Sequence, residues 1–114
     1  MPNLNKVLLM GRLTKTPELR YTPNGKAVSD LGIATTRHWK DGGDKKQFET
    51  TFTQVTVWGS QAELITKFLG KGDPILVEGR LHLERWKTKD GEDRQKLKVM
   101  GESFQFVGNK KEST

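Results

Sequence analysis

The sequence predicts a small all-β barrel of five strands with one short helix, and three observations support this fold class. Five stretches place apolar and polar residues on alternate positions, as half-buried strands do. Turn-forming residues, chiefly Gly, Asn, Asp and Pro, separate these stretches. One further stretch, between the third and fourth strands, spaces its apolar residues as a helix does. The 114 residues suffice for one hydrophobic core.

The first expected strand covers residues 5–13. Its run Val7-Leu8-Leu9-Met10 is apolar on both faces. We therefore expect both faces to be covered, with another subunit as a candidate cover for one of them. Pro17 and then Asn24-Gly25 mark a turn, because the Asn-Gly pair supplies the positive φ of a tight hairpin.

The second and third strands form the next hairpin. We expect the second from Ala27 to about Thr36, with Leu31 and Ile33 facing inward, and the third from about Phe48 to Trp58. A polar, flexible loop joins them at residues 40–46. In the third strand, alternation puts Val55 and Val57 on one face and Phe52, Gln54, Thr56 and Trp58 on the other.

The helix is expected over about residues 60–69. Ser60 and Glu63 fit a capping box, in which each side chain bonds a free backbone N–H of the first turn. Ala62, Ile65 and Leu69 form an apolar stripe, with Phe68 as a further contribution to the core. The residues that end the helix are Gly70, Gly72 and Pro74.

The last two strands, about 75–86 and 94–106, connect through Asp90-Gly91. The inner face of the fourth strand carries Ile75, Val77, Leu81 and Leu83, and the opposite face carries Glu78, Arg80, His82, Glu84 and Trp86. Five strands with a helix between the third and fourth is the order of an OB-fold, a partly open Greek-key barrel. Residues 1–107 form this domain in our interpretation, and 108–114 a polar, flexible end.

The charge of the chain favours a polyanionic partner. Twenty Lys and Arg against 14 Asp and Glu give a net charge of +6, which suits nucleic acid or an anionic membrane, although a merely soluble basic protein is also consistent. The absence of Cys excludes disulfides and thiolate metal sites and fits a reducing compartment. No signal-peptide or membrane-length apolar run is present, so we expect a cytoplasmic protein with no membrane partner.

Four large rings lie on extended segments among Lys and Arg: Trp39, Phe52, Trp58 and Trp86. Alternation puts the last three on polar strand faces, where a ring is a poor core residue and a good platform for a nucleobase. Unbroken alternation from Leu31 places Trp39 on the apolar face instead, so a bulge or the strand end is needed for it to stack. The remaining rings Tyr21, Phe48, Phe104 and Phe106 are interpreted as packing residues.

Many cations could line a phosphate track, although each could equally be a solvated surface residue. Arg80 is the strongest candidate because it shares a strand face with Trp86. The candidate phosphate ligands are Lys6, Arg12, Arg20, Arg37, Lys40, Lys71, Arg80, Arg85 and Arg94.

Nothing in the chain indicates catalysis, a metal or a cofactor. His38 and His82 have no second ligand at metal spacing and are expected on the surface. Nucleophile motifs and Gly-rich phosphate loops are missing. The carboxylates Asp90, Glu92 and Asp93 lie on a hairpin tip beside cations, which indicates a solvated turn.

Several motifs occur in an order and spacing that identify a family. Thr16-Pro17-Glu18-Leu19-Arg20-Tyr21-Thr22-Pro23-Asn24-Gly25 is the most specific, followed by Ala34-Thr35-Thr36 before Trp39, Val57-Trp58-Gly59, and Val77-Glu78-Gly79-Arg80-Leu81 before Trp86. Over nearly its full length the chain resembles the bacterial-type single-stranded DNA-binding proteins. The resemblance implies that all four rings, Trp39 included, stack bases.

The resemblance further implies a homotetramer that binds single-stranded DNA with little sequence preference in replication, recombination and repair. Two departures from the family pattern stand out. Phe52 replaces a Trp, which keeps a ring but offers less area. The chain stops at Glu112-Ser113-Thr114, without the acidic tip that recruits replication and repair proteins, so such partners are in doubt.

Two other functions stay open on the residues. An RNA-binding or primosome-type OB protein could use the same rings and cations, because nothing in the sequence selects against a 2′-hydroxyl. A protein-interaction module could bury the rings in an interface with another protein.

Overall fold

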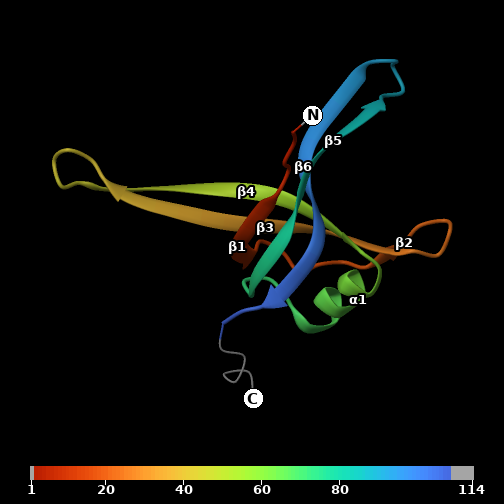
Figure 1. Cartoon of the computed structure of the whole chain (residues 1–114), viewed down its shortest axis with the longest axis horizontal. Helices are drawn as coiled ribbons and strands as arrows, with labels where there is room; N and C mark the ends of the chain where they lie inside the picture. Colours follow the sequence, from red (N-terminus) through yellow and green to blue (C-terminus); the bar gives the residue numbers. More distant parts are fainter. Residues whose placement is uncertain (1, 109–114) are drawn as a thin grey trace.

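The computed structural model describes residues 2–108, which form six strands and one helix (Figure 1). The strands are β1 (Val7–Leu13), β2 (Arg20–Tyr21), β3 (Ala27–Lys40), β4 (Lys46–Trp58), β5 (Pro74–Lys87) and β6 (Asp93–Phe106), and the helix is α1 (Gly59–Phe68). The predicted β-barrel with a helix between its third and fourth long strands is confirmed. The two-residue β2, which pairs with the start of β3, was expected only as part of a turn.

The sheet closes on itself. Its order is β1-β5-β6-β4-β3-β2, and β1 also pairs with β3 through Arg12 and Leu13. A short parallel pairing of β4 with β6 joins the two halves. Gly11 permits the crossing of β1 over β3, because a Cβ there would lie 2.3 Å from the Ala34 carbonyl oxygen.

The core lies inside this closed part of the barrel. Apolar side chains from five long strands and α1 fill it, as the alternation of the sequence predicts for β4 and the start of β5. The least exposed of them are Leu31, Ile33, Val55, Val57, Ala62, Ile65, Ile75 and Val77. Phe104 packs against this cluster, as expected.

Two long hairpins project beyond the barrel (Figure 1). In the β3–β4 arm every β3 residue from Thr36 outward is exposed, and in the β5–β6 arm every β5 residue from Arg80 outward. Leu81 and Leu83, predicted to face the core, are 45% and 37% exposed, because they lie at its edge and beyond it: Leu81 is opposite Val99, a core residue that is 2% exposed. Both leucines lie on the strand face that alternation predicts, the face that carries Ile75 and Val77.

Three local predictions were wrong. Phe68 is 52% exposed instead of buried, and Phe48, interpreted as a packing residue, is 70% exposed. The capping box does not form: α1 begins at Gly59, its N-cap is Trp58, and the cap has no side-chain hydrogen bond. Gly59 adopts a φ of 66°, which lets the chain turn into the helix two residues earlier than the Ser60 signal indicates.

Among residues 2–108, only one face of the doubly apolar β1 is covered. Val7 and Leu9 pack against the core, whereas Leu8 and Met10 are 68% and 62% exposed.

Candidate nucleic-acid interface

A groove of about 670 Å³ runs between the two arms at the ends that join the barrel. The β3–β4 arm supplies Phe52 and Gln54 to one wall, and the β5–β6 arm supplies Leu81 and Leu97 to the other. Phe52 is 72% exposed, so its ring is open to a flat ligand. Apolar walls with one open ring can accept the face of an unpaired base.

Three lysines line this groove that are not among the predicted phosphate ligands: Lys15, Lys96 and Lys98. Lys96 donates to the Gln54 side chain, and Lys98 lies 3.4 Å from a Glu84 carboxylate oxygen. A signal for two of them was present, because Lys96 and Lys98 alternate with Leu97 and Val99 in β6. Alternation alone, however, does not reveal that the two arms face one another.

Trp39 lies near the end of the β3–β4 arm. Pairing of the two strands runs without a shift from Val28–Trp58 to Lys40–Lys46, so no bulge turns the ring around. The ring is 38% exposed because the arm has left the core by this point. The Arg37 guanidinium carbon lies 4.3 Å from its centroid, and the ring borders a hollow of about 320 Å³.

Trp86 occupies the equivalent position on the other arm. It is 45% exposed, lies opposite Arg94 in the register, and borders a hollow of about 520 Å³ together with Arg85 and Lys87. Arg94 is already engaged, since its guanidinium donates to Glu92 at 2.8 Å. Arg85 has no carboxylate partner among residues 2–108.

Trp58 differs from the other three rings. It is half-buried at the junction of β4 and α1, and the Lys26 ammonium lies 5.2 Å from its ring centroid. It shares a strand face with Phe52, as alternation predicts.

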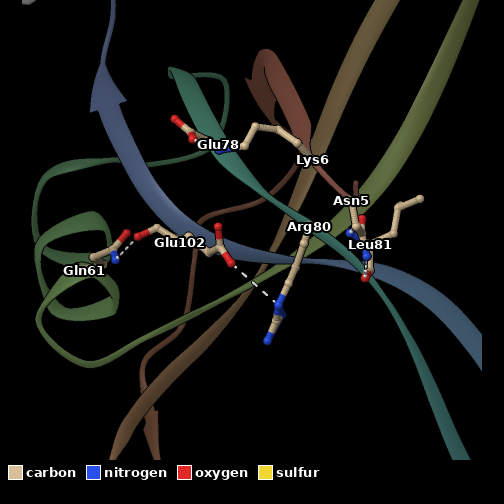
Figure 2. A network of polar contacts seen from close by, with 7 residues as sticks. All are labelled: Asn5, Lys6, Gln61, Glu78, Arg80, Leu81 and Glu102. Carbon is tan, nitrogen blue, oxygen red and sulfur yellow. Dashed lines mark hydrogen bonds and ion pairs between the residues drawn. The ribbon is translucent and has the colours of Figure 1, made fainter. Parts of the chain in front are cut away.

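Two predicted phosphate ligands on the outer face of the barrel are ion-paired (Figure 2). Lys6 pairs with Glu78, which raises the pKa of Lys6 through this hydrogen bond and the charge of the carboxylate. Arg80 lies 3.6 Å from Glu102, whose backbone oxygen accepts a bond from Gln61. Arg80 and Trp86 do share a strand face, but six residues separate them by about 20 Å.

Arg20 is paired as well, to Asp30 at 2.9 Å. Burial acts to raise the pKa of Asp30, but the Thr56 hydroxyl at 2.7 Å and the charges of Arg20 and Lys98 outweigh it and hold this pKa below its usual value. Asp30 therefore stays ionised at the floor of the groove and fixes Arg20 in place.

The other predicted cations vary in their contacts. Arg12 donates to the Gly72 carbonyl at 2.9 Å. Among residues 2–108, the side chains of Lys40 and Lys71 have no carboxylate partner. His38 and His82 are exposed as expected. Across this part of the chain, no group of three or more His, Asp or Glu could hold a metal ion. Nor does the helix described here have the length and apolarity to cross a membrane.

Comparison with known proteins identifies the family of the chain. The sequence profile of the single-strand binding protein family matches residues 4–107. The chain belongs to this family. A single-stranded DNA-binding protein of Wolinella succinogenes is 43% identical over 106 residues, and one of Helicobacter hepaticus is 39% identical over 106 residues. These alignments cover 93% of the chain but 65% and 62% of the relatives, so the chain spans less than two thirds of their length.

Two solved structures of this family share the fold. A Plasmodium falciparum SSB in complex with ssDNA superposes with a TM-score of 0.84 at 25% identity, over 95% of this chain and 98% of that one. A deletion mutant of the Thermus aquaticus single-stranded DNA binding protein gives a TM-score of 0.80 at 37% identity, over 92% of this chain and 51% of that one. The OB-fold predicted from the sequence is thereby confirmed.

Proposed function

We propose that this protein binds single-stranded DNA with little sequence preference and protects it during replication, recombination and repair. The observation that carries the proposal is the groove between the arms, in which the open ring of Phe52 lies among lysines. Trp39 and Trp86 place further rings beside cations near the ends of the two arms, Trp39 on the opposite face of its arm from Phe52. Rings beside cations bind any base by its face and the backbone by its charge, which needs no base-edge contacts.

Binding is an equilibrium without covalent chemistry in this account. Phosphates displace counterions at Lys and Arg, and each stacked base contributes about 1–3 kcal/mol as judged by Ala substitution. Duplex DNA binds weakly because its bases are already stacked and present no free face to the rings. Incubation with the protein should leave the length of an oligonucleotide unchanged.

Competition for a labelled dT oligomer tests the proposal against its alternatives. Unlabelled dT should displace the label at far lower concentration than duplex DNA of the same length. A poly-U competitor as strong as poly-dT would favour an RNA-binding function. No displacement by any nucleic acid, with the rings protected by a protein partner, would favour an interaction module.

A homo-oligomer is the assembly we propose. Leu8 lies opposite Glu78 in the register and Met10 opposite Leu76, so both exposed apolar side chains share the outer face of the barrel. Only Arg12 and Leu13 of β1 pair with β3, which leaves most of that strand edge open to a second copy. Leu8→Lys should lower the mass measured by light scattering; an unchanged oligomer would exclude this face as the contact.

A further inference from the structure

On the β3–β4 arm, the strand face that carries Phe52 continues to the tip of the arm and includes a further ring, Phe48. We call residues 34–40 with residues 46–52 the ribbon. Residues directly opposite one another in an antiparallel pair share a face. One face of the ribbon therefore presents the pairs Ala34–Phe52, Thr36–Thr50, His38–Phe48 and Lys40–Lys46, in order from the barrel to the tip.

This face carries no carboxylate. Within the ribbon the single acidic residue is Glu49, which lies on the opposite face, across from Arg37. Lys40 and Lys46 have no carboxylate partner among residues 2–108. The nearest acid in the loop, Asp41, is engaged by the turn itself: it accepts bonds from the Gly43 and Lys45 N–H groups at 2.9 and 3.1 Å.

Phe48 has no packing function that would explain its position. It is 70% exposed and lies outside the hydrophobic core cluster. Its ring contact is with His38 across the ribbon, at a centroid distance of 6.3 Å and an interplanar angle of 36°. Such a cross-strand pair contributes modestly to the stability of the ribbon and leaves most of the Phe48 ring open.

We propose that Phe48, supported by His38, is an additional stacking site for single-stranded DNA that leaves the groove along this face of the ribbon. The inference rests on the proposed function and extends it to a residue that family resemblance did not single out. Phe48 and Phe52 lie four residues apart on one strand face, or about 13 Å. Stacked bases rise about 3.4 Å each, so the two rings hold bases that are not neighbours.

The groups between and beyond the two rings suit the intervening DNA backbone. The hydroxyls of Thr36 and Thr50, 3.0 Å apart, lie between the rings and can donate to phosphate oxygens. Lys40 and Lys46 lie beyond Phe48 and supply the charge that attracts the phosphates. The face thus alternates stacking and phosphate contacts along an extended strand.

Phe48→Leu in the full chain tests this site, with Phe68→Leu as the matched control. Both rings are more than half exposed, so neither change should unfold the barrel. Phe48→Leu should weaken binding to a long dT oligomer roughly tenfold, within the range for one stacked base, while Phe68→Leu leaves it unchanged. Phe48→Trp should retain the wild-type affinity and add an indole whose fluorescence falls when dT binds.

The outcomes separate this inference from the proposed function. If the wild type binds dT and Phe48→Leu binds equally well, the additional site is absent and the function stands. If the melting temperature falls while affinity does not, Phe48 serves the cross-strand pair alone and the inference is overturned. A Phe48→Trp variant as weak as Phe48→Leu would also overturn it. A wild type that does not bind dT removes both proposals.

Discussion

The cations at the end of the β3–β4 arm and those on the outer face of the barrel are in different electrostatic states. At the ends of the arms, Lys40, Lys46 and Arg85 have no carboxylate partner among residues 2–108, and Arg37 lies over a Trp ring. On the outer face, Lys6 and Arg80 pair with Glu78 and Glu102. Sequence alone put both sets into one phosphate track. The structure indicates that the end of the β3–β4 arm offers its charge to a polyanion, whereas the outer face has already neutralised its own. The β5–β6 arm is intermediate, because Lys87, Arg94 and Lys98 pair with carboxylates of the same arm and Arg85 does not.

The largest expected effect comes from removing a ring on an arm. Trp86→Ala should weaken binding of a dT oligomer by roughly tenfold or more, because one stacked base contributes about 1–3 kcal/mol. Fluorescence anisotropy of labelled dT measures the affinity, and circular dichroism verifies the fold. Phe106→Leu, which alters an exposed ring next to Phe68, should bind as the wild type does. If Trp86→Ala and Phe106→Leu lowered the affinity for dT equally, the ring on the arm would have no special role in binding.

The next effect is electrostatic. Lys40→Gln combined with Lys46→Gln should reduce the slope of log affinity against log salt by about 1.4, since each phosphate neutralised on a single strand contributes about 0.7. Affinities measured from low to moderate salt give this slope. An unchanged slope would show that the end of the β3–β4 arm makes no phosphate contact.

A third effect concerns Asp30, which lines the groove and pairs with Arg20 of β2. Its pKa is lower in the folded protein than its ordinary value of 3.8, so ionised Asp30 stabilises the fold above that value. This contribution disappears as the pH falls through the folded-state pKa. Asp30→Asn should therefore lower the free energy of unfolding at pH 7 by about 1 kcal/mol.

Urea unfolding across the acid range measures this contribution. The stability of the Asp30→Asn variant should fall less steeply than that of the wild type as the pH drops toward about 3. Parallel pH profiles for the two proteins would contradict the role of the Arg20–Asp30–Thr56 group.

The smallest effect is expected on the outer face. Glu78→Gln frees Lys6 from its partner, yet affinity for dT should change by less than about twofold, because exposed ion pairs are weak and this face lies away from the groove. Clearly tighter binding by this variant would place DNA on the outer face. The distinction between the two regions would then be wrong.

The sequence was sufficient for the barrel and for the strand faces, but it did not reveal the extent of the core. Alternation correctly buries Val55, Val57, Ile75 and Val77. The same alternation places Leu81 inward, yet Leu81 lies at the edge of the core, opposite Val99, and is 45% exposed. Periodicity reports which face a side chain takes, and the length of the barrel decides whether anything packs against that face.

The sequence also did not reveal which charged residues form ion pairs. Arg80 meets Glu102 because the register of β5 and β6 shifts between Glu78 and Gly79. A Cβ at Gly79 would lie 2.1 Å from the Met100 carbonyl oxygen, so the bulge depends on this glycine. Contacts across strands follow from register, which one sequence does not specify.

The most direct test of the account is a titration of intrinsic Trp fluorescence with dT oligomers of increasing length. The three tryptophans of the chain report stacking, because an indole in contact with a base loses its emission. Stacking on these rings predicts saturable quenching, with an affinity that rises with oligomer length until the DNA fills both arms. Binding of dT that leaves the emission unchanged would contradict stacking on Trp39, Trp58 and Trp86.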